Sequence, residues 1–170
     1  MIRKHKLYSK PRKPYDLVRI KSEDEIVNKY VLKSKIEIWK AKAKLDKIRR
    51  IAKSLLRGSS EQEQNSFLEK LSKQGYNVKN VVEVLALTEG DILNRRLQTV
   101  VYKKGIATTP KGARQMITHK RIIVDKRIVN VPSYLISKDE ETKISSKMSK
   151  QPKAVKEEKE VIDEMEAIIK

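Results

Sequence analysis

Apolar residues recur along this chain at the spacing of amphipathic helices, and short capping and turn sequences separate the recurrent stretches. The clearest stretch covers residues 34–57, where one apolar stripe returns every three or four positions. The members of this stripe are Ile38, Ala41, Leu45, Ile48, Ala52 and Leu55. Gly58 stands where such a helix would end. The pattern predicts a long helix with one buried face, and we expect Trp39 to pack in the core or between helices.

Shorter helices are expected on both sides of this one. A Ser and a Glu at capping-box spacing predict a helix over residues 22–32, and a second such pair predicts a helix over residues 60–74, closed by Gly75. A short apolar segment, residues 81–87, then leads to Thr88, which can cap the next helix. We interpret these pieces as scaffold.

The helix expected over residues 89–104 has an apolar side and a polar side, and Gly105 ends it. The core-facing side chains are Ile92, Leu93, Leu97, Val100 and Val101. The side chains left polar are Arg95, Arg96, Gln98, Thr99, Lys103 and Lys104. This division predicts one face for the core and one for a polar partner.

A second helix and a hairpin are expected directly afterwards. Thr109 can cap the helix, with Pro110 in the first turn, where its missing N–H costs nothing. The inward residues are Ala113, Met116 and Ile117, and the outward ones are Lys111, Arg114, Gln115 and Thr118. Alternating apolar residues around a turn at 125–127 then predict a small β-hairpin. The chain as a whole reads as a mostly helical α+β fold, with an amino-terminal helical layer around a small helix-helix-hairpin unit.

The charge of the chain is strongly and unevenly positive. Its 170 residues carry 40 Lys and Arg against 22 Asp and Glu, which gives a net charge of +18. Residues 1–138 hold 33 of the bases and 13 of the acids. This balance predicts a polyanionic partner, and phosphates that bind here are expected to stabilise the fold as well. The excess of Lys over Arg fits a thermophile and an AT-rich genome equally well.

Several classes of function are excluded by composition. No apolar run approaches the roughly 18 residues that span a bilayer, and the first ten residues lack the apolar core of a signal peptide. We therefore expect an intracellular protein without a membrane partner. The chain has no Cys and only two His residues, His5 and His119, so we predict no metal site, no Cys nucleophile and no cofactor. It also lacks a Gly-rich phosphate loop.

The polar surface of the 34–57 helix is almost entirely basic, with Asp46 as the one acid between Lys40 and Arg57. A helix face that is merely solvated usually mixes charges of both signs. We therefore predict that this face follows a phosphate backbone, for which 1.5 Å per residue gives ample length. The side chains assigned to it are Lys40, Lys44, Lys47, Arg49 and Arg50.

Residues 1–21 have the composition of an extended basic arm, because two prolines at 11 and 14 prevent a continuous helix. Tyr8 and Tyr15 favour nucleic-acid binding, since an aromatic ring among cations can stack on a base. A solvated terminus is the alternative. The phosphate contacts assigned to the arm are Lys4, Arg12 and Lys13.

Three segments resemble the RNA-binding module named after small-subunit ribosomal protein four, namely RRLQTVVYKKGIA, GARQMITHK and VDKRIVNVPSY. The segment PRKPYDLVRIKSEDEIVNKYVLKSKIEIWKAKAKLDKIRRIAKSLL is similar to the helical amino-terminal part of the archaeal and eukaryotic branch of that ribosomal protein family. The resemblance covers roughly residues 10–138. Bacterial members often carry a zinc-binding Cys cluster, and its absence here agrees with the archaeal-type branch.

The resemblance implies a non-enzymatic constituent of the small ribosomal subunit, in the cytoplasm, whose module has the alpha-L type of fold. It implies a primary binder of 16S-type rRNA at a helix junction of the 5′ domain, which nucleates assembly and contributes to translational accuracy. The implied neighbours are small-subunit ribosomal proteins five and three and the mRNA where it enters, with no DNA partner. The module residues that take the family's RNA-facing places are Arg95, Arg96, Gln98, Thr99, Lys103, Arg114 and Gln115. Further candidate RNA contacts in the module are Lys111, His119, Lys120 and Arg121.

Two positions depart from the family pattern, and one residue keeps two interpretations. Lys120 stands where many members have Gly, and Asp125-Lys126 stands at the hairpin tip where many have Asn-Gly. Either Lys126 adopts a positive φ, at a cost of about 1 kcal/mol, or the turn changes type. His119 is either a packing and hydrogen-bonding residue or a direct RNA contact.

The sequence after residue 138 lies outside the resemblance. Residues 143–153 have the composition of a linker, and an acidic amphipathic helix is expected beyond it. A helix of that length is only marginally stable alone, so it either docks on a protein surface or frays. The predicted division is therefore a basic extended arm at 1–21, a helical rRNA-binding region at 22–90, the small RNA-binding module at 91–138, and the linker with its helix at 139–170.

Two other functions compete with a ribosomal role. An RNA-modifying enzyme can use the same module as an appendage, but it needs a catalytic domain of well over a hundred further residues. A free-standing RNA chaperone or tRNA-binding stress factor needs only the module. The long basic helix and the basic arm argue against the second rival, because they imply a large, fixed RNA surface.

Overall fold

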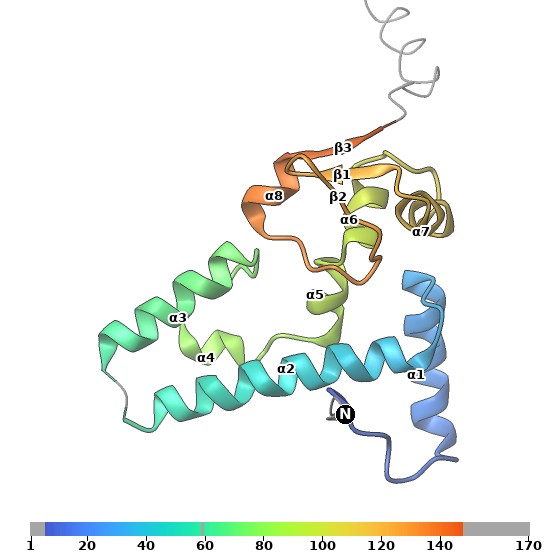
Figure 1. Cartoon of the computed structure of the whole chain (residues 1–170). Coiled ribbons are helices and arrows are strands. Elements are labelled where there is room, and N and C mark those ends of the chain that lie inside the picture. Colours follow the sequence, from blue (N-terminus) through green and yellow to red (C-terminus); the bar gives the residue numbers. More distant parts are fainter. Residues whose placement is uncertain (1–5, 59, 148–170) are drawn as a thin grey trace, which may run out of the picture.

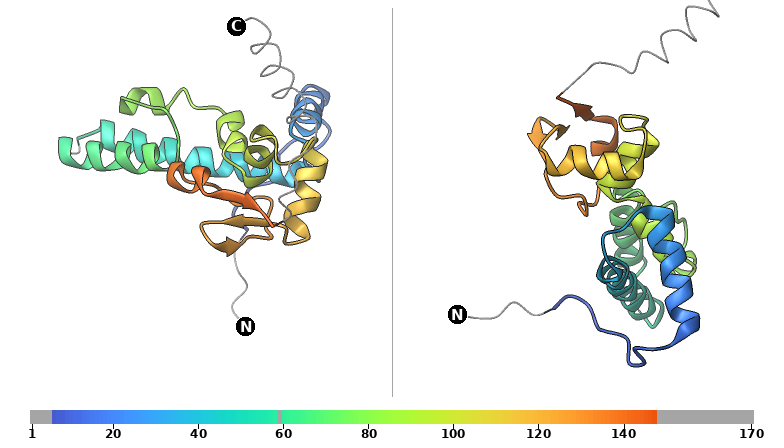
Figure 2. Two further views of the ribbon diagram at one scale, coloured as in Figure 1. Left: turned by 90° about the horizontal axis from the view of Figure 1, so that it is seen from above. Right: turned by 90° about the vertical axis from the view of Figure 1, so that its right-hand side faces the viewer.

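The structure is a computed structural model that describes residues 6–58 and 60–147. Figure 1 shows two parts, a helical layer built on the long helix α2 and an α/β module above it, with α5 between them. The same division is clear from the side in Figure 2. This arrangement confirms the mostly helical α+β fold. The elements are α1 (Leu17–Tyr30), α2 (Lys35–Leu56), α3 (Glu61–Lys73), α4 (Val81–Val84), α5 (Glu89–Asn94), α6 (Leu97–Lys103), α7 (Pro110–Thr118), β1 (Ile122–Val124), β2 (Arg127–Ile128), α8 (Lys138–Thr142) and β3 (Ile144–Ser146).

Helix α2 matches its prediction closely, with Ser34 as its N-cap and Arg57 as its C-cap. Its stripe packs into the first of two apolar cores. Trp39 is partly buried against this core, and its indole N–H donates to Glu23 Oε1 at 3.0 Å. The packing role predicted for Trp39 is therefore confirmed.

Helix α1 begins at Leu17, so the predicted start at Ser22 is wrong. The Asp16 carboxylate accepts hydrogen bonds from the backbone N–H groups of Val18 and Arg19, which caps the helix six residues earlier than predicted. Ser22 lies within the helix, where its hydroxyl donates to the Arg19 carbonyl at 2.9 Å. The extended part of the arm consequently ends at Asp16 rather than at residue 21.

The single helix expected over residues 89–104 is also wrong, because it is divided into α5 and α6. Arg96 adopts an extended conformation at the break. The returning segment 132–136 takes up the backbone groups freed there: the Leu97 N–H donates to Tyr134 O at 2.8 Å, and Ile136 N–H donates to Arg95 O at 3.0 Å. Backbone pairing with a segment some forty residues away therefore replaces helical hydrogen bonds.

The module carries a three-stranded antiparallel sheet in the order β2-β1-β3. The predicted hairpin is present as β1 and β2, and Asp125 and Lys126 at its tip have φ of 45° and 66°. Two positive φ values in a two-residue turn are those of a type I′ turn, so Lys126 does adopt the strained conformation.

The third strand corrects the predicted linker. β3 pairs with β1 in the register Ile122↔Ser146 and Val124↔Ile144, and α8 precedes it. Residues 139–147 therefore belong to the module. The acidic helix expected further on lies outside the described residues, as do the far end of the predicted linker and Lys4.

Two apolar cores meet at the break between α5 and α6. The core of the helical layer ends at Leu93, and the core of the module begins at Leu97. In the module, Ala113 and Ile117 of α7 and Ile122 of β1 belong to the same core, and all three are fully buried. Each part of the molecule thus has its own interior, and their relative position depends on contacts between them.

Candidate nucleic-acid interface

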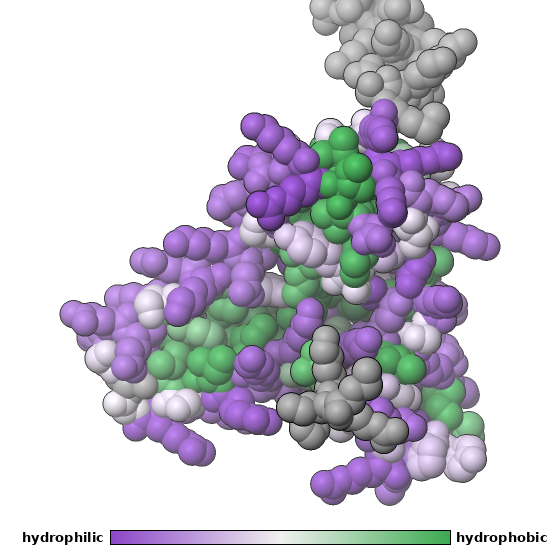
Figure 3. All heavy atoms as spheres, in the orientation of Figure 1, coloured by the Kyte–Doolittle hydropathy of each residue, from purple (hydrophilic) through white to green (hydrophobic). Residues whose placement is uncertain are grey.

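The exposed side of α2 carries most of the cations predicted for it. Lys40, Lys44, Lys47 and Arg50 are exposed along the helix, while Arg49 turns inward and donates from Nη2 to Leu87 O at 2.7 Å. Figure 3 shows that hydrophilic side chains cover much of the face seen in Figure 1, with apolar patches between them. The 22 residues of α2 span about 33 Å at 1.5 Å per residue, so the helix can follow several phosphates of one RNA strand.

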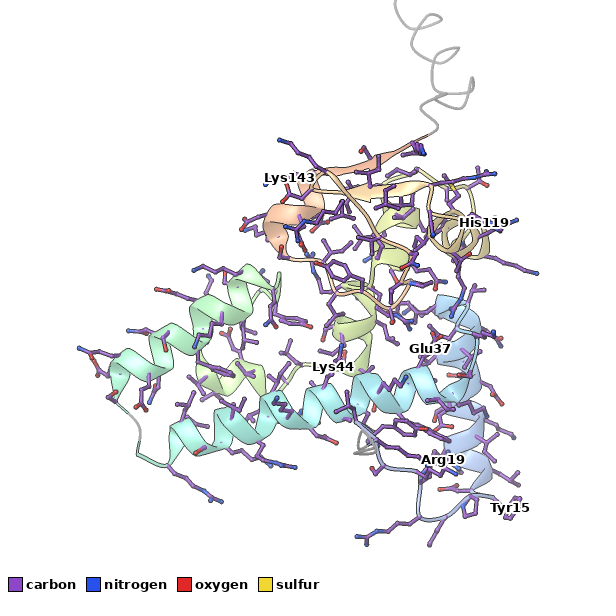
Figure 4. The ribbon with its side chains drawn as sticks, viewed as in Figure 1. Tyr15, Arg19, Glu37, Lys44, His119 and Lys143 are labelled. Atoms are coloured by element: carbon purple, nitrogen blue, oxygen red, sulfur yellow. The ribbon has the colours of Figure 1, made fainter. Side chains whose placement is uncertain are left out.

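The helical layer and the module are joined by a group of four side chains, here called the Glu37 cluster. Arg96 and Gln98 are buried, and Glu37 and Arg114 are partly buried. Arg96 Nη2 lies 2.8 Å from Glu37 Oε2, and Arg114 Nη2 lies 2.6 Å from Glu37 Oε1. Arg114 also donates to the Gln98 side-chain oxygen at 3.1 Å. Figure 4 shows Glu37 on α2 close to the module. One carboxylate thus holds arginines from two separate elements.

Electrostatics keep Glu37 ionised. Burial alone would raise the pKa of this carboxyl, but the hydrogen bond from Arg114 and the charge of Arg96 outweigh burial, so its pKa is lowered. The pKa of Lys44 is also lowered, by burial first and then by the positive charges of Arg96 and Lys40. The space near α2 and Arg96 therefore holds more positive charge than Glu37 neutralises.

Two of the predicted RNA-facing residues are buried, which contradicts the expectation that they are left at the surface. Gln98 is 1% exposed, and its amide donates to the carbonyls of Tyr30, Val31 and Pro110. Arg96 is 5% exposed and paired with Glu37. Their positions follow from the break at Arg96, which turns both side chains toward the helical layer. Both side chains therefore make contacts within the protein, between the helical layer and the module.

Arg95 and Thr99 are also engaged within the protein. Arg95 Nη1 lies 2.6 Å from Glu141 Oε2, and its Nη2 donates to Ile136 O at 2.9 Å. The Thr99 hydroxyl donates to the Leu93 carbonyl at 2.8 Å. Arg95 thereby holds α8 against the break, while Thr99 secures the end of α5. Neither is positioned as a free surface donor.

A second exposed basic group lies on the module, along α7 and just past its C-terminal end. Lys111, Gln115, His119, Lys120 and Arg121 are all exposed there. His119 is the C-cap of α7 and its side chain is exposed. This exposure does not support the packing interpretation, and contact with RNA stays a proposal. Lys120 has a φ of 57°, in the left-handed region, at the position where the family pattern has Gly. Lys103, exposed on α6, is 3.2 Å from Asn94 Oδ1.

The arm contributes cations and one free aromatic ring. Arg12 and Lys13 are exposed, as predicted for phosphate contacts. Tyr8 lies against Trp39, with ring centroids 6.1 Å apart and planes at 37°, whereas Tyr15 is 89% exposed. Figure 4 shows Tyr15 at the outer end of the chain's first helix. Of these two tyrosines, Tyr15 is thus the one that remains available for stacking on a base.

Two acids that organise this region, Glu37 and Glu141, could not be recognised from the sequence pattern. Glu37 lies in the first turn of α2, where an acid is ordinarily interpreted as a partner of the helix dipole.

Within residues 6–58 and 60–147, no group of three or more His, Asp or Glu side chains is placed to hold a metal ion. No helix in the same ranges has the length and apolar character to cross a membrane.

The sequence of this chain is similar to one protein-family model and to proteins of one ribosomal family. A family model described as the S4 domain matches residues 95–141. Three relatives are each named small ribosomal subunit protein uS4. The one from Methanothermobacter thermautotrophicus is 41% identical over 161 residues, covering 89% of this chain and 94% of the relative. Those from Methanococcus aeolicus and Thermoplasma volcanium are 42% and 43% identical, covering 82% and 83% of this chain and 82% and 74% of the relatives.

These relatives confirm the resemblance found in the sequence, including its archaeal-type branch, and the prediction of a ribosomal protein rather than an enzyme. The match of the S4 domain extends to residue 141, past the predicted module boundary, in agreement with the position of α8. The chain belongs to the uS4 family of small ribosomal subunit proteins.

Proposed function

We propose that this chain is a primary binder of small-subunit rRNA that recognises a helix junction in the 5′ domain. One observation carries the proposal: Lys40, Lys44 and Lys47 of α2 line the same groove as Ser133 and Leu135 of the module. Cations of the helical layer and residues of the module thus border one groove, which a single RNA ligand could occupy. A junction presents several backbones at fixed angles, and a rigid two-part surface suits it better than a single flexible module would.

The contact residues we propose are the exposed members of the predicted set. They are Arg12, Lys13, Lys40, Lys44, Lys47, Arg50, Lys103, Lys111, Gln115, His119, Lys120 and Arg121. The Glu37 cluster holds the helical layer and the module together, and it thereby sets the distance between the basic group on α2 and the basic group along α7 and just past its end. Phosphate contacts position the RNA, and the Gln115 and Arg121 side chains are suited to contact base edges as well.

Further roles follow from family membership. Early binding to the 5′ domain would let this protein nucleate assembly of the subunit. A place near the path by which mRNA enters, next to ribosomal proteins five and three, would let it contribute to translational accuracy. The large basic surface supports rRNA as the main partner, because RNA binding by so many cations releases many counterions.

Chemical footprinting of the full chain on naked small-subunit rRNA tests the proposal, together with binding to the isolated 5′ domain and to an unrelated structured RNA. We expect protection at one junction and much tighter binding to the 5′ domain across a salt titration. Equal affinity for both RNAs would instead indicate a general RNA chaperone or a tRNA-binding factor. The double substitution K44Q/K47Q is expected to weaken binding, whereas K70Q/K73Q on α3 serves as a control of equal charge.

A further inference from the structure

A groove of about 460 Å³ runs between α2 and the segment 133–135 of the module. Its accessible apolar part comes from Leu135 on the module side, which is partly buried, and the core residues Ala41, Ile92 and Leu93 form the wall behind it. Leu7 of the arm also borders it and is 84% exposed. The volume lies within the range of sites that hold a small organic ligand.

The charged part of the groove is positive. Lys40, Lys44, Lys47 and Arg96 line it, against the single carboxylate of Glu37. That carboxylate is already held by Arg96 and by Arg114. A surplus of positive charge therefore remains beside an apolar surface, and an anionic group entering the groove would reduce the mutual repulsion of these cations.

Arg96 also has a donor that a ligand in the groove could use. Its side chain is 6% exposed, and Nη2 is used by Glu37, but its Nε is buried and has no hydrogen-bond partner among the residues the structure describes, as is also true of Nε in Arg19, Arg49 and Arg95. Of these four arginines, Arg96 is the one that lines this groove, and a buried donor without an acceptor costs roughly 1–3 kcal/mol. An oxygen of a bound ligand would be a suitable acceptor.

The apolar residues argue against a site for phosphate alone. A phosphate is bound by N–H groups and positive charge, and it gains nothing from Leu7 or Leu135. A nucleotide has both parts, because it joins a phosphate to a base whose faces are apolar. In a paired A-form helix the bases are stacked out of reach, whereas unpaired nucleotides at junctions and bulges can turn outward.

We propose that this groove binds one unstacked nucleotide of the RNA, with its phosphate near Arg96, Lys40 and Lys44 and its base against Leu135. The inference rests on the proposed binding of rRNA and specifies which kind of nucleotide the groove takes. It also gives Leu7 a role, since this exposed side chain borders the groove and can cover the base from the arm.

Methyl NMR on the full chain tests the groove without rRNA. AMP and UMP are titrated in parallel with inorganic phosphate, and the methyl groups of Ile92, Leu93 and Leu135 are followed. We expect at least one nucleotide to shift these methyl signals and the Arg96 Nε–H signal, while phosphate leaves the methyl signals in place. Equal methyl shifts with phosphate, or no groove shift with either nucleotide, would overturn the proposal.

A second measurement uses the 5′ domain RNA. Ser133→Trp places a bulky side chain at the groove without changing charge, and Ser72→Trp makes the same change on the exposed side of α3. Loss of one base contact corresponds to about tenfold weaker binding. We expect Ser133→Trp and Leu7→Ser to weaken binding to the 5′ domain RNA by this factor, and Ser72→Trp to leave it unchanged.

The two proposals fail separately. Specific binding of the 5′ domain with equal affinity for Ser133→Trp, Leu7→Ser and Ser72→Trp refutes the groove and leaves rRNA binding intact. Failure of the unmodified chain to prefer the 5′ domain refutes the proposed function, and the mononucleotide titration still decides on the groove.

Discussion

Glu37 is a single carboxylate on which the contact between two parts of the protein depends. Its two oxygens bind arginines from the break before α6 and from α7, while the residue itself sits in the first turn of α2. Only 17% of its side chain is exposed, so water can replace little of what either arginine would lose. The energetic importance of the residue comes from this lack of an alternative partner.

The substitution Glu37→Gln is expected to lower the free energy of unfolding by about 3 kcal/mol, because it leaves the buried Arg96 without its counter-charge. In thermal unfolding this corresponds to a fall in Tm of roughly 6–12 °C for a chain of this size. Asp125→Asn removes one charge of the exposed pair with Lys143, whose side chains are 54% and 56% exposed, and serves as the control. Equal effects of the two substitutions would show that burial of the Glu37 cluster is unimportant.

The stability contributed by Glu37 is expected to depend on pH in one direction. Because the pKa of Glu37 is lowered on folding, its contribution is complete above the ordinary value of 4.5 and is lost as pH falls through the lower pKa of the folded protein. Urea unfolding from about pH 6 to about pH 3 measures this, with the difference between wild type and Glu37→Gln shrinking toward acid. A difference that stays constant over this range would contradict the prediction.

The strained turn at Lys126 offers a stabilising substitution. With φ at 66°, Lys126→Gly removes the steric cost of the left-handed conformation and is expected to raise the free energy of unfolding by about 1 kcal/mol. Arg127→Gly, at the first position of β2, is the matched control and is expected to destabilise, since glycine weakens a strand. The urea midpoint reports both. A loss of stability with Lys126→Gly would mean that the lysine side chain makes a compensating contact.

At the scale of elements, the sequence was sufficient wherever the signals were local. The spans of α2 and α7 follow from their caps and apolar stripes, and Thr109 does accept the Gly112 N–H at 3.0 Å. The break between α5 and α6 could not be predicted in this way. Its cause is hydrogen bonding to residues 132–136, which no local pattern around Arg95 and Arg96 contains.

β3 was missed for a similar reason. Residues 144–146 are one isoleucine and two serines, too short and too polar to stand out as a strand, and their pairing with β1 is what defines them. Only Ile144 is buried, at the inner face of the sheet. A strand of this kind is set by its partner rather than by its own propensity.

The importance of β3 can be measured with two neighbouring substitutions. Ile144→Ala is expected to cost about 2–4 kcal/mol of unfolding free energy, as for other buried isoleucines. Ser145→Ala, on the exposed face of the same strand, is expected to change it by no more than about 0.5 kcal/mol. Thermal unfolding of the full chain gives both values. If Ile144→Ala is as harmless as Ser145→Ala, residues 144–146 behave as a linker after all.

For the whole molecule, the net charge counted from the sequence predicted a polyanionic partner, but it did not predict which cations are exposed to that partner. Lys47 and Arg49 are two residues apart on α2, and the sequence pattern assigned both to the same basic face. In the structure Lys47 is exposed, whereas Arg49 donates a hydrogen bond to Leu87 O. Likewise, Arg96 and Gln98 were assigned to the RNA side and instead lie between the two cores. Arginine and glutamine are useful in both places, so only the packed structure separates them.

The same pair of residues provides a test at this scale. Lys47→Gln is expected to reduce the slope of log K against log salt for binding to the 5′ domain by about 0.9, as for one phosphate contact fewer on a duplex. Arg49→Gln is expected to leave that slope unchanged and to lower stability by about 1–2 kcal/mol through the lost hydrogen bond. A salt titration and an unfolding curve on each variant distinguish the roles. Equal slopes for wild type and Lys47→Gln would place Lys47 outside the interface.

The strand order β2-β1-β3 has a consequence for how the protein is made. Synthesis delivers β1 and β2 together as a hairpin, but the other edge of β1 has no partner until residues 144–146 have left the ribosomal tunnel. During that interval its backbone N–H and C=O groups can pair with another chain. A newly made copy is thus most prone to misassociate shortly before its sheet is completed, and the few residues of β3 end that period.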